Sequence, residues 1–224
     1  MFDPAVVETT VDFLVALAGE GRALELGIGT GRIALPLAQR GIPVHGIDLS
    51  EEMVARMRAK PGAGDIAVTI GDFATTRVEG SFSLAYVVFN TIGNLTTQDA
   101  QVACFQNVAN HLEPAGCFVI ELGVPDLRRL PPGERFVLFA VSDAHVGIDE
   151  YATADQGLVS HHFSRRADGQ YERTSLPFRY TWPAELDLMA RLAGMTLRER
   201  WSDWNRAPFT SESTSHVSVW QKSA

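Results

Sequence analysis

The first half of the chain alternates between two spacings of hydrophobic residues. Apolar residues three and four positions apart, typical of helices, alternate with short continuous apolar runs bounded by Gly and Pro, typical of buried strands. The expected strands are 23–26, 42–49, 66–70, 82–89 and 116–122, and the expected helices are 4–18, 32–40, 50–60 and 97–112. This order predicts a parallel sheet with helices on both faces, an α/β fold.

The pattern changes after Leu122, where four runs rich in Val, Phe, Tyr and Thr follow one another. These expected strands are 136–144, 146–154, 158–166 and 171–180. Short links between such runs are hairpin signals, so they predict an antiparallel meander. A helix from Pro183 to Gly194 and strands at 196–201 and 215–221 then return to the α/β pattern. We therefore expect residues 1–135 and 181–224 to form the core and 136–180 to form a β-rich cap inserted into it.

Composition and charge narrow the class of protein. The 27 Asp and Glu residues outnumber the 19 Lys and Arg residues, and the net charge of −8 argues against a nucleic-acid partner. No apolar stretch approaches the roughly 18 residues of a membrane span, and no secretory signal opens the chain, so we expect a cytoplasmic protein. Cys104 and Cys117 lack metal-type spacing and no set of ligating carboxylates appears, so we expect no metal.

A glycine-rich segment, Glu25 to Gly31, lies between the first expected strand and the next helix. Glycines let the backbone approach a ligand, but this pattern alone also suits a nicotinamide-binding oxidoreductase. Asp48 follows Gly29 by 19 residues, at the end of the second strand, where a carboxylate can accept both hydroxyls of a ribose. Asp72 ends the third strand and can accept a hydrogen bond from an exocyclic amine.

Together these motifs resemble those of the class I S-adenosylmethionine-dependent methyltransferases. The resemblance rests on Ala-Leu-Glu-Leu-Gly-Ile-Gly-Thr-Gly-Arg (23–32), Gly-Ile-Asp-Leu-Ser-Glu-Glu-Met (46–53) and Ile-Gly-Asp-Phe (70–73), with weaker likeness at 88–95 and 111–116. In the last of these, Ala115 stands where the family usually has glycine. The resemblance implies a Rossmann-like seven-stranded sheet whose last strand is antiparallel, and S-adenosylmethionine as the cofactor, lying across the ends of the first, second and fourth strands.

The resemblance also implies roles for individual residues. It places Glu25, Gly27 and Gly29 at the methionine part of the cofactor, Asp48 at the ribose with Leu49 beside it, Asp72 and Phe73 at the adenine, and Phe89 and Asn90 near the sulfonium. It further implies methyl transfer by in-line displacement, which depends on alignment more than on covalent help from the protein.

The acceptor is expected to be a small molecule. The Asn-Pro-Pro-Tyr signature of DNA methyltransferases is missing, because Thr91 follows Asn90. Similarity to small-molecule N-methyltransferases favours nitrogen slightly over oxygen as the methylated atom. Substrate contacts are expected from the cap and from loops at the strand ends, and the candidates are Asn94, Tyr151, Arg179, Tyr180 and Trp204.

A general base is required only if the acceptor arrives protonated, and the candidates are His161 and His145. Adjacent His161 and His162 must point to opposite faces of a strand. Few residues precede the first strand, so we expect either a more open cofactor site or one that is covered by the cap or by a partner subunit in a homodimer. Two alternatives stay open: an NAD(P)-dependent Rossmann oxidoreductase, which would leave Asp72 without a role, and a non-catalytic protein that binds S-adenosylmethionine.

Overall fold

The computed structural model describes residues 4–223, and of Arg129 the backbone only. The α/β part is made of α1 (Pro4–Ala18), β1 (Ala23–Leu26), α2 (Ala34–Gln39), β2 (Val44–Asp48), α3 (Glu51–Arg58), η1 (Ala63–Asp65), β3 (Ala67–Ile70), β4 (Phe82–Val87), η2 (Thr91–Asn94), α4 (Gln98–His111), β5 (Leu112–Gly123), η3 (Leu127–Arg129), α5 (Pro183–Leu192), β10 (Met195–Trp201) and β11 (Ser215–Lys222). The cap is made of β6 (Phe136–Val141), β7 (His145–Ala152), β8 (Gly157–Arg165) and β9 (Tyr171–Arg179).

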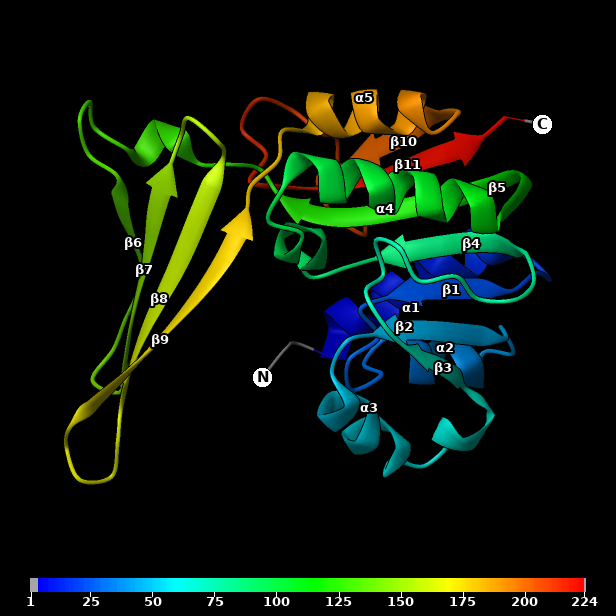
Figure 1. The fold of residues 1–224 in the computed structure, drawn as a ribbon, viewed down its shortest axis with the longest axis horizontal. Helices are drawn as coiled ribbons and strands as arrows, with labels where there is room; N and C mark the ends of the chain where they lie inside the picture. The colour runs from blue at the N-terminus through cyan, green and yellow to red at the C-terminus, as the bar shows by residue number, and fades with distance from the viewer. Residues whose placement is uncertain (1–3, 224) are drawn as a thin grey trace.

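The larger sheet has seven strands in the order β10-β11-β5-β4-β1-β2-β3 (Figure 1). The pairs β1–β2, β1–β4, β2–β3 and β4–β5 are parallel, whereas β11 is antiparallel to both β5 and β10. Because β10 opposes β11, it runs in the direction of the parallel strands, and β11 alone is reversed. The expected sheet with an antiparallel last strand is therefore confirmed.

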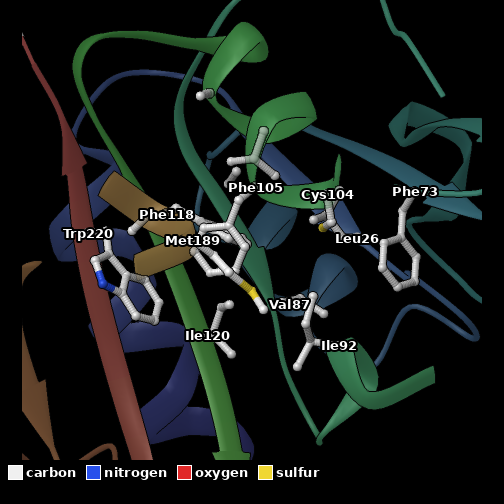
Figure 2. Close-up of a cluster of buried hydrophobic side chains, with 14 of the residues drawn as sticks. Leu26, Phe73, Val87, Ile92, Cys104, Phe105, Phe118, Ile120, Met189 and Trp220 are labelled. Atoms are coloured by element: carbon white, nitrogen blue, oxygen red, sulfur yellow. The ribbon is translucent and has the colours of Figure 1, made fainter. Parts of the chain in front are cut away.

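Two hydrophobic layers cover the faces of this sheet, because successive strand residues point to opposite sides. On β5, Phe118 and Ile120 face α4 and α5, while Cys117 and Val119 face the layer that includes α1, α2 and α3. Figure 2 shows the first layer, in which Phe105 contacts Phe118 edge to face with ring centroids 5.1 Å apart. Buried aromatic pairs of this kind fix how helix and strand pack.

The four cap strands form a separate antiparallel sheet, β6-β7-β8-β9, which extends from one end of the core (Figure 1). It enters the chain between β5 and α5. The strand ends next to the core are Ala152, Gly157 and Arg179, while the turn between β6 and β7 and the turn between β8 and β9 lie at the far end, which we call the cap tip. The expected meander is confirmed.

The structure differs from the sequence prediction at the start of β5. That strand begins at Leu112, earlier than the predicted residue 116, and its register with β4 shifts between Phe82 and Leu84. Residues 113–116 accommodate the shift, and Ala115 takes the left-handed conformation with φ 63°. A turn is expected before β5, but the structure instead has an irregularity within the strand. Ala115 therefore occupies a conformation that normally favours glycine.

Candidate functional site

The glycine-rich loop between β1 and α2 depends on conformations that only glycine adopts easily. Gly27, Gly29 and Gly31 have φ values of 72°, 53° and 73°. A Cβ atom on Gly27 would lie 2.6 Å from Cγ2 of Thr91, so the loop also packs tightly against η2. The backbone N–H of Gly27 donates to the carbonyl of Ile47 at 2.8 Å. These contacts hold the loop across the ends of β1 and β2.

Asp48, the last residue of β2, is bonded to this loop. Its Oδ2 accepts from the backbone N–H of Gly29 at 2.6 Å, and its Oδ1 accepts from that of Ser50 at 2.8 Å. Beside this fixed carboxylate, the side chains of Leu49 and Met53 stay exposed, at 68% and 42%. A carboxylate next to exposed apolar side chains suits a ligand that carries two hydroxyl groups, as a ribose does, and a flat ring system.

Asp72 and Phe73 follow β3 at the same edge of the sheet. The Oδ1 of Asp72 accepts from the backbone N–H of Ala74 at 2.8 Å, which shapes the turn. The Phe73 side chain is only 6% exposed and lies at one end of the hydrophobic cluster in Figure 2. Its ring packs near the glycine loop, since Cε1 lies 3.9 Å from where a Cβ of Gly27 would be. Phe73 therefore supports the loop from the core side.

Glu25 lies inside the core at the end of β1. Its Oε2 accepts from the Tyr86 hydroxyl at 2.9 Å, and its carboxyl group is also bonded to the backbone of Ala34 at the start of α2. Burial raises the pKa of Glu25 to about 8, although these two hydrogen bonds oppose the rise. The side chain thus connects β1, β4 and the helix that follows the glycine loop.

The backbone of the two residues that lie just beyond β4 is strained. Phe89 and Asn90 are consecutive non-glycine residues in the left-handed region, with φ values of 56° and 60°. Such conformations cost of order 1–3 kcal/mol each and gather at functional sites. Two bonds to β5 hold them: Phe89 N–H donates to Glu121 Oε2 at 2.9 Å, and Asn90 Oδ1 accepts from Gly123 N–H at 2.6 Å.

A cavity of about 270 Å³ lies between the end of β5, η2 and the cap. The core contributes Asn90, Gly93 and the segment from Leu122 to Pro125, and the cap contributes Asp149, Tyr151, Leu158, Ser160, Phe178, Arg179 and Tyr180. Of the expected substrate residues, Tyr151, Arg179 and Tyr180 line this cavity. Asn90 links it to the strand ends that carry the glycine loop, because β4 and β1 are neighbours.

Asp149 is a lining residue that the sequence analysis did not single out. It pairs with Ser160 across β7 and β8, so both side chains lie on the cavity face of the cap. Burial raises the pKa of the Asp149 carboxyl group, against an opposing hydrogen bond from Ser160. Strand alternation offered a signal, because Asp149 and Tyr151 are two residues apart and must share a face.

Arg179 lines the cavity, but its guanidinium group is committed elsewhere. It is 4% exposed and donates to Gln101 Oε1 at 2.6 Å, to Glu185 Oε1 at 2.7 Å and to Gln156 Oε1 at 3.1 Å. These partners lie on α4, on α5 and in the link between β7 and β8. The arginine therefore fastens the cap to the core.

The structure does not bring two other substrate candidates to this cavity. Asn94 is exposed on η2, where its side-chain amide donates to the carbonyl of Thr91 at 3.1 Å. Trp204 is buried against Phe13 of α1, with ring centroids 5.3 Å apart, and lines a different cavity of about 380 Å³ beside α1 and Glu121.

The two histidine candidates also lie away from the cavity lining. His161 is on the opposite face of β8, where its ring nitrogens lie 3.2 Å from Glu150 Oε2 and 2.8 Å from Ser175 Oγ. His145 shares the face of Asp149 but lies near the cap tip, stacked on His162 with centroids 5.3 Å apart. Neither ring lines the 270 Å³ cavity.

Comparison with known proteins supports the interpretation of these strand ends. A family described as "Methyltransferase domain" matches residues 23–116. The structure of the CcbJ methyltransferase from Streptomyces caelestis is similar at 36% identity, with a TM-score of 0.89 over 99% of this chain and 91% of that one. The cypemycin N-terminal methyltransferase of a Streptomyces species is 26% identical over 91% of this chain and 84% of its own.

A more distant structure contains the cofactor. CalS10 from Micromonospora echinaspora, an amino pentose methyltransferase solved with S-adenosylmethionine bound, shares the fold with a TM-score of 0.72 at 19% identity, over 97% of this chain and 90% of that one. In the present chain, the glycine loop, the Asp48 carboxylate and the exposed Leu49 and Met53 provide groups suited to the methionine part, the ribose and the adenine of that molecule. The chain therefore belongs to the class I S-adenosylmethionine-dependent methyltransferases, and S-adenosylmethionine is its cofactor.

Proposed function

We propose that this enzyme transfers the methyl group to a nitrogen of a small-molecule amine held in the cavity between cap and core. The proposal rests mainly on the position of Asn90, which lies in the strained segment after β4 and also lines that cavity. A volume of about 270 Å³ suits a small ligand and is too small for a folded macromolecule. The cypemycin relative is named for N-terminal methylation, which supports nitrogen as the acceptor atom.

Alignment is the contribution that these residues make to the reaction. When bound, the cofactor supplies an electrophilic methyl group on a positively charged sulfur. The glycine loop and Asp48 fix one side of the site, and the hydrogen bonds that join Phe89 and Asn90 to β5 fix the other side. Holding two reactants in line is worth up to about 7–11 kcal/mol of barrier in well-aligned systems.

The alternatives from the sequence have less support. An NAD(P)-dependent oxidoreductase is disfavoured because the three proteins compared above are all methyltransferases. A protein that binds the cofactor without transferring its methyl group would not need a lined cavity next to Asn90.

Filling the cavity tests the proposal. Leu158→Trp places a large ring in the lining, and Leu197→Trp makes the same change on β10 at a site that is 44% exposed. We expect Leu158→Trp to reduce amine methylation at least tenfold while the affinity for S-adenosylhomocysteine stays within twofold of the wild type. Leu197→Trp should change neither value. Full activity of Leu158→Trp would overturn the assignment of this cavity.

A further inference from the structure

A chain of four polar side chains runs along the cavity face of the cap. The Ser160 hydroxyl is hydrogen-bonded to Asp149, and its Oγ lies 3.3 Å from Nε2 of His162. Nδ1 of His162 lies in turn 3.0 Å from Nε2 of His145. The strand register explains the alignment, because Asp149 pairs with Ser160, and His162, opposite Gly147, and His145, opposite Ser164, follow on the same face. The chain connects the cavity wall with the region of the cap tip.

An aromatic ring covers part of this chain. The ring of Phe139 on β6 lies 5.5 Å from that of His162 and 6.4 Å from that of His145. Gly147 makes this position possible, since a Cβ there would lie 2.3 Å from two atoms of the Phe139 ring. Ser160, in the middle of the chain, is only 8% exposed. Covering of this kind limits exchange of the bonded groups with water.

Methylation of an amine requires a group that removes a proton and a route by which the proton leaves. Aliphatic amines are protonated near neutral pH, as the lysine side chain is, and an ammonium ion has no lone pair with which to attack a methyl group. A base must therefore remove one proton before transfer. Asp149 is the carboxylate among the residues that line the cavity, and its negative charge suits an ammonium ion.

We propose that Asp149 binds the acceptor ammonium and removes its proton, and that Ser160, His162 and His145 carry this proton along the cap to solvent. This inference rests on the proposed amine acceptor. An N–H bond breaks as an O–H bond forms on Asp149. The freed nitrogen lone pair then forms the N–CH₃ bond, while the C–S bond of the cofactor breaks and its electron pair stays on the sulfur. Each group in the chain releases one proton as it receives one, and His145 releases the last to water.

The charges around Asp149 suit this role. Burial raises its pKa, and the opposing influences are the hydrogen bond from Ser160 and the nearby His162 and His161 rings. The core side of the cavity presents the neutral amide of Asn90. The cap also presents Tyr151, Tyr180, Phe178 and Arg179, and the guanidinium of Arg179 is bonded to Gln101, Gln156 and Glu185. Each histidine ring can donate or accept at either nitrogen, depending on its tautomer, so the chain can transfer hydrogens in either direction. Asp149 accepts a proton only when ionised, so activity should fall as pH drops through its raised pKa.

Three variants and one matched control test the chain. Asp149→Asn should lower kcat/KM for an amine by about 10²-fold or more, the usual contribution of a general base. His162→Gln and His145→Gln act on positioning residues, and each should lower kcat several-fold in dilute buffer and recover in concentrated imidazole buffer, which accepts the proton directly. The control is His161→Gln, one residue away on the opposite face of β8 and outside the chain, which should show no recovery of kcat in imidazole buffer.

The outcomes separate the two proposals. If the wild type methylates no amine, both fall. If it methylates an amine but Asp149→Asn keeps the wild-type rate and pH profile, or the His162 and His145 variants show no buffer dependence, the proton path alone is wrong. As a measurement independent of activity, ¹⁵N NMR should show changed imidazole ¹⁵N chemical shifts of His162 and His145 in Asp149→Asn. Unchanged chemical shifts of both rings would also overturn the path.

Discussion

The Asp48 carboxylate accepts a hydrogen bond from the backbone N–H of Gly29 at 2.6 Å, which ties the end of β2 to the glycine loop after β1. The two residues are 19 positions apart in sequence and meet because β1 and β2 are parallel neighbours. One oxygen atom of this carboxylate thus holds the loop, and Ser50 N–H holds the other. The arrangement places a carboxyl group beside the glycine loop before any ligand binds.

Replacing Asp48 should weaken cofactor binding. Asp48→Ala removes a charged acceptor for the ribose hydroxyls and releases the loop, which should cost on the order of 1.5–3 kcal/mol in binding. Calorimetry with S-adenosylhomocysteine measures this value directly. Asp65→Ala, which removes an exposed carboxylate on η1, is the matched control and should keep wild-type affinity. Equal affinities for both variants would contradict the assignment of Asp48.

Adding one methyl group to the glycine loop should damage both folding and binding. In Gly27→Ala the new Cβ would clash with Thr91 Cγ2 and adopt an unfavourable positive φ, whereas in Gly41→Ala a similar φ of 87° meets open space. Gly41→Ala should therefore lower the free energy of unfolding only by the conformational cost, about 1–2 kcal/mol. Gly27→Ala should lose more free energy of unfolding and also cofactor affinity. Denaturant titration and calorimetry measure the two losses, and equal behaviour of the variants would refute the tight loop.

The buried Glu25 should make stability fall as pH rises. Burial raises its pKa to about 8 in the folded state, from an ordinary value of 4.5. Between these values the folded state binds more protons than the unfolded state, so raising pH disfavours the fold. Glu25→Gln removes this titration. The stability of the wild type relative to the variant should therefore decline from pH 4.5 to pH 8 in denaturant unfolding, and a constant difference across this range would show that Glu25 is not held protonated.

The Arg179–Glu185 pair should be worth far more than its surface counterpart. Its side chains are 4% and 15% exposed, whereas those of Arg128 and Glu212 are 63% and 82% exposed. Arg179→Met leaves a largely buried carboxylate without its charged partner, which typically costs 3–5 kcal/mol, and Arg128→Met should cost about 1 kcal/mol or less. Denaturant unfolding compares them. Limited proteolysis should also cut the cap faster in Arg179→Met, and similar losses in both variants would contradict the role of Arg179.

Much of this fold follows from local patterns in the sequence. The alternation of strands and helices, the cap meander and the glycine loop come from signals that act over a few residues, whereas the reversed last strand of the larger sheet is expected only from the family resemblance carried by the motifs at 23–32 and 46–53. Ala115 is an exception, because tertiary pairing of β5 with β4 imposes a backbone conformation that alanine disfavours.

The acceptor side was harder to predict because it depends on how two sheets meet. Strand alternation gives the face of Asp149 but not its distance from β5, and it does not reveal that Ser160 and His162 continue the hydrogen bonding. Arg179 is expected to contact substrate because it lies in the cap. Its partners, from α4, α5 and a cap turn, are brought together only by the complete fold.

Identifying the atom that receives the methyl group is the most direct test of the proposed function. The enzyme would be incubated with S-adenosylmethionine carrying a CD₃ group and with pairs of small acceptors that differ only in bearing an amine or a hydroxyl group. Mass spectrometry and NMR would then locate the label. We expect CD₃ on the nitrogen of the amine, with at least a tenfold preference over the matched alcohol. Label on oxygen, or none on any small molecule while S-adenosylhomocysteine still binds tightly, would contradict the assignment.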